Sequence, residues 1–484
     1  MCTGRSGGHV LVVAHGPDAG SRVQAWKQAG QRVRVLWCGT GSLPAGVDGI
    51  RLDSVAIPKD DCLVNLLQLP TADRSDRIRH AVEVLHQAEA FDWIEFPCRG
   101  GLGFRTMQAH RQGGALAGVQ LVVYLDSTAD SERQQQQRLI GNLDDLELDY
   151  CERQAFELAD VRVISDPVLL DYVRQRGWTP LEQSPPLASR QPLVTVCVSY
   201  YNLGRFLPCA LHALARQTYP ALEVLVIDDG STEDFSRRVF AEQEKIHRHF
   251  RFLRQQNAGI GATRNRGLFE ARGEFFLPVD ADNVACPNMV ERLVAGMNRR
   301  PDLAALSCYF HAFREQEDLH CQRFHYACRP TGGPHVLGCF RNVYGDANAL
   351  YRTDAFRSVG GYETDRGTSF EDWEAFVKLV QAGYRVDVLP EVLFYYRHLS
   401  TGFSRSTRAF ANQQRVLRAF RSVENLPMAE RQLIWAALAG LGQAAEQRAA
   451  RDRRLPYRVA EGVIAVGRQI AQPIRQLWAC LTGL

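Results

Sequence analysis

The sequence predicts an α/β protein with two doubly wound, Rossmann-like α/β domains and a C-terminal helical segment. Short apolar runs of strand length alternate with amphipathic stretches of helical period along most of the 484-residue chain. The runs are apolar throughout, which is typical of parallel strands that helices cover on both faces. Composition agrees, because 45% hydrophobic and 23% charged residues indicate a folded globular chain.

The first domain is expected over residues 1–182. Its predicted strands alternate with helical patterns such as DRIRHAVEVLHQAEA, and they cover His9–Ala14, Arg32–Trp37, Phe91–Pro97, Val119–Leu125 and Asp160–Ser165. Residues 183–192 carry prolines and small polar residues, which break both periodicities and predict a linker.

The second domain is expected over residues 193–405 and repeats the alternation of strands and helices. Its clearest strands are predicted at Pro192–Ser199, Ala221–Asp229 and Gly273–Asp280. Residues 406–484 are rich in Ala, Arg, Gln and Leu, and they predict the helical segment.

Charge and apolar length exclude several classes of protein. The formal net charge is only +3 and no basic run occurs, so no nucleic-acid partner is expected. No stretch reaches the ~18 to 20 apolar residues that span a bilayer, which argues against a membrane-embedded synthase. The absence of a secretory signal and the scattered cysteines predict a cytoplasmic protein with reduced thiols. A basic amphipathic pattern near the C-terminus leaves two alternatives, peripheral contact with the inner face of the cell membrane or packing on the catalytic domain.

Polar residues gather at four places in the second domain, where a predicted strand ends or a helix begins. They are Ser199-Tyr200-Tyr201-Asn202, Asp228-Asp229-Gly230, Asp280-Ala281-Asp282 and Glu371-Asp372-Trp373. Ligands of open α/β sheets bind at the carboxyl ends of the strands, so these clusters are candidates for one site. Each cluster taken alone is also explained as a turn or a helix cap.

The residue types in these clusters suit sugar transfer from a nucleotide. Asp280 and Asp282 offer two carboxylates to one Mn²⁺ or Mg²⁺, which fills its remaining positions with substrate phosphates. Such an ion would neutralise a diphosphate leaving group. Asp372 opens a helix, where it can serve the helix dipole or act as the general base that removes a proton from a sugar hydroxyl.

Six motifs occur in order between about Pro192 and Arg405: VSYYN, VLVIDDGSTED, QQNAGIGATRNRGL, FFLPVDADN, FEDWE and YYRHLSTGFSR. Together they resemble family 2 glycosyltransferases, which have the GT-A fold. The resemblance implies an inverting, metal-dependent transfer of a sugar from a nucleotide-diphosphate sugar donor to a hydroxyl of a glycan or lipid-linked glycan acceptor. By family analogy alone, the setting is bacterial surface polysaccharide synthesis.

The resemblance also implies a role for each matching residue. The implied contacts of the nucleotide-sugar donor are Ser199, Tyr201, Asp228, Asp229, Arg264 and Asp280. The implied metal ligands, for Mn²⁺ or Mg²⁺, are Asp282, Asp280 and His398. Asp372 is the implied catalytic base, and Glu371 shapes the acceptor site beside it.

The first domain carries a second resemblance. The segments FDWIEFPCRGGLGFRTMQAHRQGG and ERQAFELADVRVISDPVLLDYVRQRGW resemble the N-terminal lobe of family 4 glycosyltransferases, which have the GT-B fold. In that fold this lobe mainly binds the acceptor, and a second lobe holds the donor. Nothing after Trp178 resembles that second lobe. The first domain is therefore expected to bind the acceptor or to dock, and not to transfer sugar by itself.

Two alternatives to this interpretation follow from the residues. The stretch 308–339 is rich in Cys and His, which can form a structural zinc site, although its spacing fits no paired CxxC pattern. The chain is also compatible with a non-catalytic glycan-binding or scaffold protein with a vestigial GT-A site. The intact acids Asp229, Asp280, Asp282 and Asp372 argue against that alternative.

Overall fold

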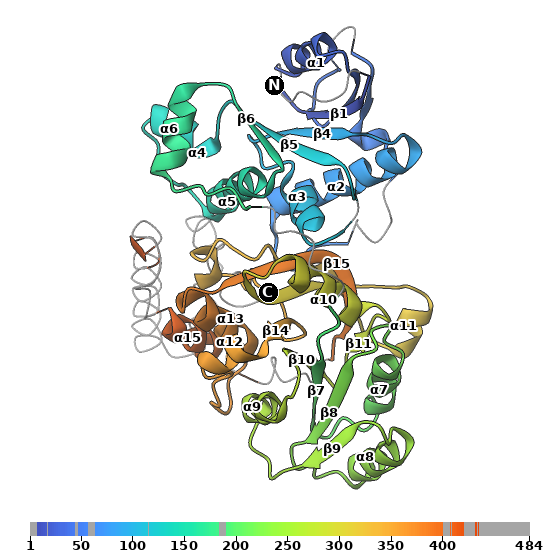
Figure 1. Cartoon of the computed structure of the whole chain (residues 1–484). Coiled ribbons are helices and arrows are strands. Elements are labelled where there is room, and N and C mark those ends of the chain that lie inside the picture. Colours follow the sequence, from blue (N-terminus) through green and yellow to red (C-terminus); the bar gives the residue numbers. More distant parts are fainter. Residues whose placement is uncertain are drawn as a thin grey trace, which may run out of the picture.

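The structure is a computed structural model that describes residues 7–16, 18–43, 47–56, 63–114, 116–182, 190–399, 407, 409–420, 431–432 and 434. It contains two β-sheets, one in each half of the chain (Figure 1). We call the half that carries the first sheet the first domain and the other half the second domain. Among the described residues, no helix is both long and apolar enough to cross a membrane.

The first domain contains a six-stranded parallel sheet with the strand order β3-β2-β1-β4-β5-β6. This is the order of a doubly wound Rossmann-like fold, which confirms the predicted fold class. The strands are β1 (His9–Ala14), β2 (Arg32–Trp37), β3 (Gly49–Arg51), β4 (Trp93–Pro97), β5 (Gln120–Leu125) and β6 (Val161–Ile164). The short edge strand β3 was not predicted, because three residues carry too little periodicity.

Helices cover both faces of this first sheet. They are α1 (Ala19–Gln28), α2 (Pro70–Ala88), α3 (Phe104–Arg111), α4 (Ala129–Gln135), α5 (Leu143–Leu158) and α6 (Pro167–Gln175). Side chains alternate along β1, so that Val10 and Val12 pack with α1 while Leu11 and Val13 pack in the core with α2, α3 and α5. All four side chains are fully buried, which is why the strand is apolar throughout.

The second domain contains a nine-stranded mixed sheet. Its main path runs β11-β15-β12-β14-β10-β7-β8-β9, and β13 pairs with β12. The strands are β7 (Val194–Tyr200), β8 (Leu222–Asp228), β9 (Arg251–Arg254), β10 (Phe275–Asp280), β11 (Val284–Ala285), β12 (Leu303–Phe313), β13 (Tyr326–Cys328), β14 (Leu350–Arg352) and β15 (Arg385–Arg397). The strands predicted before β11 are confirmed, and they form a parallel block, whereas β14 joins this block to β12 in antiparallel direction.

The helices of the second domain are α7 (Leu207–Ala215), α8 (Asp234–Ile246), α9 (Ile260–Glu270), α10 (Met289–Arg299), α11 (Gln316–His320), α12 (Thr353–Ser358), α13 (Glu371–Gln381) and α15 (Ala409–Ala419). Two single turns of 3-10 helix lie at Leu52–Ser54 and Leu337–Cys339. Of the predicted C-terminal helical segment, α15 is confirmed. Most of 421–484 lies outside the described residues, so contact of that segment with a membrane stays a prediction.

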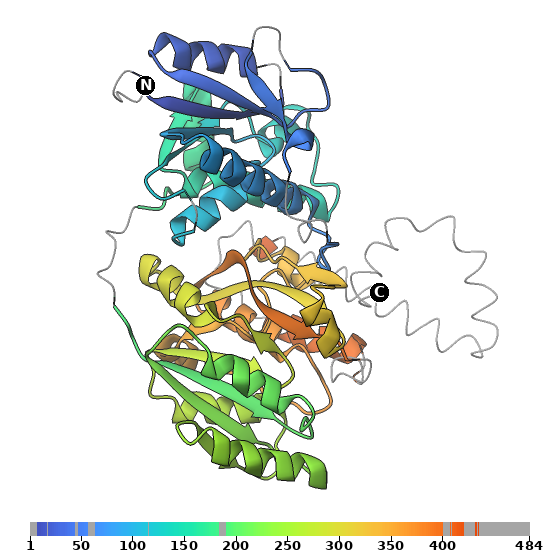
Figure 2. The same ribbon diagram turned by 90° about the vertical axis from the view of Figure 1, so that its right-hand side faces the viewer.

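The two domains lie one above the other (Figure 2). They share one continuous apolar core and a polar seam. The guanidinium of Arg105 on α3 is fully buried and donates to the carbonyl of Pro330 over 2.8 Å. The Gln108 amide, one turn on, donates to Asp387 of β15 over 2.7 Å. Asn65 forms a parallel bridge with Ala327 of β13. A segment of the first domain thus pairs with a strand of the second sheet.

Candidate active site

Three neighbouring strand ends, those of β10, β7 and β8, lie at one edge of the second sheet. Parallel pairing places Asp280, at the end of β10, opposite Ser199 of β7, and the next pair joins Tyr200 of β7 to Asp228 of β8. The sequence predicted this arrangement, because the carboxyl ends of parallel strands lie at the same edge. Tyr201 follows directly and is 42% exposed, so its ring is accessible for stacking.

Arg264 holds the centre of the site together. Its guanidinium is 2% exposed and donates to Asp280 over 2.6 Å and to Glu371 over 2.6 Å. Arg264 comes from α9 and Glu371 from the first turn of α13, so two helices and a strand meet at one cation. Charge-assisted bonds of this length are strong and directional. In this structure Arg264 therefore positions two acids of the site.

Asp282 lies in the turn after β10. Burial, followed by the negative charge of Asp280, raises the pKa of Asp282 to about 7. Arg397 donates to the backbone carbonyl of Asp282 over 3.1 Å, and its charge opposes the rise in the pKa of Asp282.

Asp372 lies at the start of α13, next to Glu371. One carboxylate oxygen accepts from the Trp373 amide over 2.8 Å. Burial, then the charges of Glu371 and Asp346, raises the pKa of Asp372. A carboxylate with a raised pKa is a better proton acceptor, so this environment suits a general base. The indole of Trp373 donates to the Gly338 carbonyl over 2.9 Å, which fixes the start of the helix.

Asp346 was not predicted from the sequence. It lies in the loop before β14, and its carboxylate accepts from the Asn348 amide over 3.0 Å. Burial, then the charge of Asp280, raises the pKa of Asp346, and Asp346 in turn acts on Asp282 and Asp372. Asp346 is therefore within electrostatic range of both the predicted metal ligands and the predicted base. The segment YGDANAL contains no predicted strand end or helix start, so the local sequence did not mark Asp346 as a site residue.

Asp228 and Asp229 organise the loops that surround the strand end. Asp228 accepts from the Ser231 amide over 2.9 Å. Asp229 accepts from the amides of Ala258 and Gly259, each over 2.8 Å. Both carboxylates are buried and already hydrogen-bonded to protein. Their contact with a nucleobase stays a prediction, and the observed contacts show a structural role as well.

His398 follows β15 and lies beside the acidic turn. Its Nδ1 is 2.9 Å from the hydroxyl of Tyr326, and its ring meets that of Tyr326 edge-on. The preceding residue, Arg397, binds the turn itself, because its amide donates to Asn283 over 3.0 Å. Arg397 thus contacts the acidic turn, whereas the His398 ring contacts Tyr326, and the role of His398 as a metal ligand stays a prediction.

The acidic turn fits a hard divalent cation in its chemistry. Asp280 and Asp282 supply carboxylate oxygens, which are the ligands that such cations prefer. In the described part of the chain, no group of three or more His, Cys, Asp or Glu is close enough to hold a metal by protein ligands alone. The same finding applies to the described residues of the Cys/His-rich stretch 308–339. Cys308, Cys328 and Cys339 are instead buried singly in the core.

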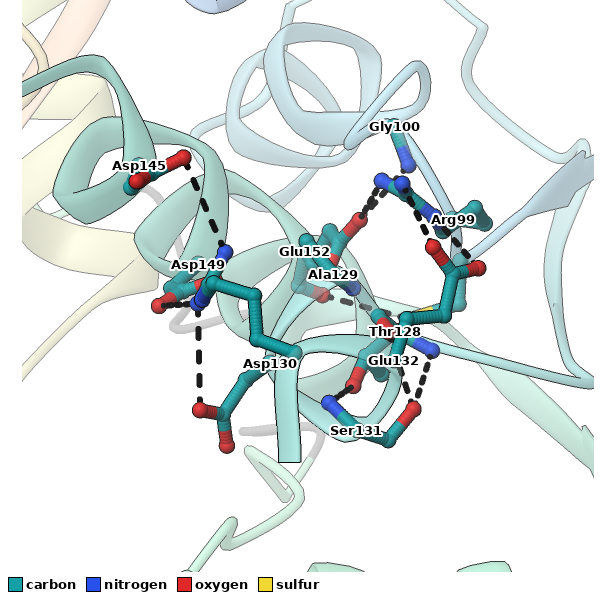
Figure 3. Close-up of polar contacts among 12 residues, drawn as sticks. Arg99, Gly100, Thr128, Ala129, Asp130, Ser131, Glu132, Asp145, Asp149 and Glu152 are labelled. Atoms are coloured by element: carbon teal, nitrogen blue, oxygen red, sulfur yellow. Dashed lines mark hydrogen bonds and ion pairs between the residues drawn. The ribbon is translucent and has the colours of Figure 1, made fainter. Parts of the chain in front are cut away.

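A second polar cluster lies at the carboxyl edge of the first sheet (Figure 3). Arg99, after β4, pairs with Glu132 over 2.9 Å and with Glu152 over 3.1 Å. Glu152 also accepts from the amides of Gly100 and Ala129. The charges of this cluster satisfy one another, so the glycine-rich loop after β4 serves the fold.

Comparison with known proteins gives one family match. Residues 195–360 match the model of glycosyl transferase family 2. The putative glycosyltransferase EpsH of Bacillus subtilis (strain 168) is 33% identical over 112 residues, which are 23% of this chain and 32% of that protein. The glucosyl-dolichyl phosphate glucuronosyltransferase of Haloferax volcanii is 27% identical over 182 residues, 36% of this chain and 57% of that protein. The chain thus spans between about a third and three fifths of these relatives.

Among solved structures, the mannosyltransferase PcManGT from Pyrobaculum calidifontis, in complex with GDP-Man and Mn²⁺, gives a TM-score of 0.42 at 21% identity, over 65% of this chain and 92% of that chain. The predicted resemblance of the first domain to a family 4 lobe is not confirmed and stays a prediction. The family match covers all the strand-end acids but ends before α13. The part of the chain that contains Ser199, Asp228, Arg264, Asp280 and Asp282 is therefore similar to glycosyl transferase family 2, as its motifs predict.

Proposed function

We propose that this protein is an inverting glycosyltransferase that moves a sugar from a nucleoside diphosphate sugar to a hydroxyl of a glycan or lipid-linked glycan. The observation that carries the proposal is the bridge made by Arg264, which joins Asp280 at the end of β10 to Glu371 at the start of α13, next to Asp372. A separated pair of acidic groups suits transfer, because one group manages the leaving diphosphate while the other activates the acceptor.

In the proposed reaction Asp372 accepts the proton of the acceptor hydroxyl. The hydroxyl oxygen then bonds to the anomeric carbon, and the bond from that carbon to the diphosphate oxygen breaks. The nucleoside diphosphate leaves with the electron pair. One displacement inverts the anomeric configuration, since no carboxylate forms a bond to the sugar.

Asp280 and Asp282 would hold a divalent cation, whose chemistry is to neutralise charge on the leaving diphosphate. The protein groups around them define the rest of the donor side. Arg264 keeps Asp280 in place, and the exposed ring of Tyr201 is available to a base. The polysaccharide setting is proposed by analogy with the similar proteins, which include the chondroitin synthase of Escherichia coli.

The proposal predicts that donor binding depends on the acidic turn. Calorimetric titration of the full chain with UDP- and GDP-sugars should give micromolar to submillimolar binding that weakens at least about tenfold when Mn²⁺ is removed. Asp282→Asn should lose this dependence on Mn²⁺, because it removes one anionic ligand.

Asp302→Asn is a matched control, since Asp302 is also a partly buried acid of the second domain but pairs with Arg300. Unchanged donor affinity in the Asp282 variant, with and without Mn²⁺, would contradict the proposed donor site. Tight donor binding without any donor consumption would instead support the glycan-binding alternative.

A further inference from the structure

A cavity of about 660 Å³ lies at the seam between the two domains. Its walls come from the end of β2, from the 3-10 turn that contains Asp53, from the segment before α2, from the first turns of α2, and from one residue of the second domain. The residues that the argument uses are Cys38, Asn65, Asp73, Arg74, Arg77 and Arg329. The volume is in the range of small-molecule sites. None of the residues assigned to the proposed donor site lines this cavity.

The cavity begins where β2 ends, at Cys38 and Gly39, which is the carboxyl edge of the first sheet. Ligands of doubly wound sheets bind at this edge. The neighbouring part of the edge, after β4, is filled by the mutual ion pairs of Arg99, Glu132 and Glu152 (Figure 3). Among the described residues, the end of β2 therefore offers the more open position for a ligand.

Both domains fix the shape of the cavity. The amide of Arg329 donates to the Asn65 side chain over 3.1 Å, and the Arg329 guanidinium donates to the Leu63 carbonyl over 3.1 Å. Figure 2 shows this blue segment of the first domain reaching the second. Burial raises the pKa of the Cys328 thiol, and so do the charges of Asp346, Asp372 and Asp73. One thiol next to the cavity is thus within electrostatic range of the proposed base.

The charges in the cavity differ in how far the protein neutralises them. The buried guanidinium of Arg329 lies 3.8 Å from the carboxylate of Asp76, so these two charges largely neutralise each other. Arg74 and Arg77 are exposed and lie three residues apart, on one side of α2. Arg74 donates to the Cys38 carbonyl, and no acidic partner of Arg77 is found among the described residues. Two guanidinium groups are thus available to an anion.

Hydrogen-bonding groups lie beside this pair. The Asn65 amide donates to the Asp73 carboxyl group over 2.8 Å. An amide and a carboxyl group at the wall can accept from, or donate to, the hydroxyls of a sugar. The cavity therefore combines an anion-binding side with a hydroxyl-binding side.

We propose that this cavity binds the acceptor of the proposed transfer, and that the acceptor is a glycan with an anionic group, a phosphate or a carboxylate, held by Arg74 and Arg77. The proposal rests on the proposed function, because it assigns the cavity to the second substrate of the same reaction. It makes Arg74 and Arg77 determinants of acceptor specificity, with no part in donor binding.

The test is ligand-observed NMR titration of the full chain with glucose 1-phosphate, glucuronic acid, glucose and inorganic phosphate. The two anionic sugars should bind at least about tenfold more tightly than glucose, since a charge-assisted contact is worth about that factor. The double variant Arg74→Gln/Arg77→Gln, and Arg77→Glu alone, should lose the preference. Arg32→Gln is the matched control, because Arg32 is exposed at the opposite end of β2.

Equal binding of glucose and glucose 1-phosphate, or a preference that survives in the double variant, would overturn the proposal. So would inorganic phosphate that binds as tightly as glucose 1-phosphate, because the site would then recognise no sugar. Donor turnover measured on the same samples separates the two claims. If the protein consumes donor but does not bind the anionic sugars, only the role proposed for the cavity is contradicted. If it binds the anionic sugars but consumes no donor, both the proposed function and the acceptor role are contradicted.

Discussion

Asp372→Asn is expected to lower the rate of sugar transfer by about 10²-fold or more, the usual scale for loss of a general base. The substitution keeps the shape of the side chain and the oxygen that accepts from the Trp373 amide. Helix α13 should therefore stay in place, and donor affinity should hardly change. Single-turnover kinetics and donor calorimetry on the same samples measure both quantities.

The pH dependence gives an independent readout for Asp372. A base works when it is unprotonated, and the pKa of Asp372 is raised by burial and by Glu371. The transfer rate of the wild type should therefore rise with pH through this raised pKa, and the variant should lose that limb of the profile. Asp354→Asn is the matched control, because Asp354 lies in the first turn of α12 with its side chain fully exposed. A collapse of donor affinity in Asp372→Asn would assign the residue to the donor instead.

Arg264→Met is expected to cost about 3 to 5 kcal/mol of folding free energy, because it leaves two largely buried carboxylates without their cation. The guanidinium donates to Asp280 and to Glu371, each over 2.6 Å, and it is almost completely buried, so solvent screens neither pair. The transfer rate should fall as well, since both acids lose their common anchor. Denaturant unfolding of the wild type and the variant measures the difference.

The sign of the pH effect distinguishes this account from simple loss of packing. Without Arg264, the carboxylates of Asp280 and Glu371 lose their cation, and an unpaired buried carboxylate destabilises the fold only while it is ionised. The penalty then grows as pH rises above about 4, where unfolded carboxyl groups ionise, and it disappears below that value. Arg248→Met is a control, because Arg248 is exposed. A deficit that is equal at pH 4 and pH 8 would show that Arg264 acts through packing alone.

The sequence predicted the parts of this molecule that depend on local pattern. The apolar strands, the acids at their ends and the order of the motifs were sufficient to place Asp280, Asp282 and the acids of α13 in one site. Parallel pairing brings the strand-end acids together, whereas Arg264 links the start of α13 to them. Arg264 was predicted as a donor contact, and the structure shows in addition that it holds Asp280 and Glu371.

The features that sequence could not predict depend on contacts between distant segments. Asp346 lies in a loop without a periodic pattern, and only the fold brings it to Asp280. Nothing in the local sequence marks the polar side chains of Arg105 and Gln108 as buried. In the structure they lie in the seam, where they donate to residues more than 200 positions away. The domain boundary was inferred from a linker, whereas the shared core shows that the two halves pack as one body.

The most direct test of the account is product analysis with the full chain, Mn²⁺ and a panel of UDP- and GDP-sugars, with anionic glycans as acceptors. The account predicts release of nucleoside diphosphate with at least one donor. It also predicts that ¹H NMR of the new glycosidic bond shows the anomeric configuration opposite to that of the donor. Retained configuration would contradict the single displacement at Asp372, and a folded chain that binds donors but consumes none would contradict the glycosyltransferase itself.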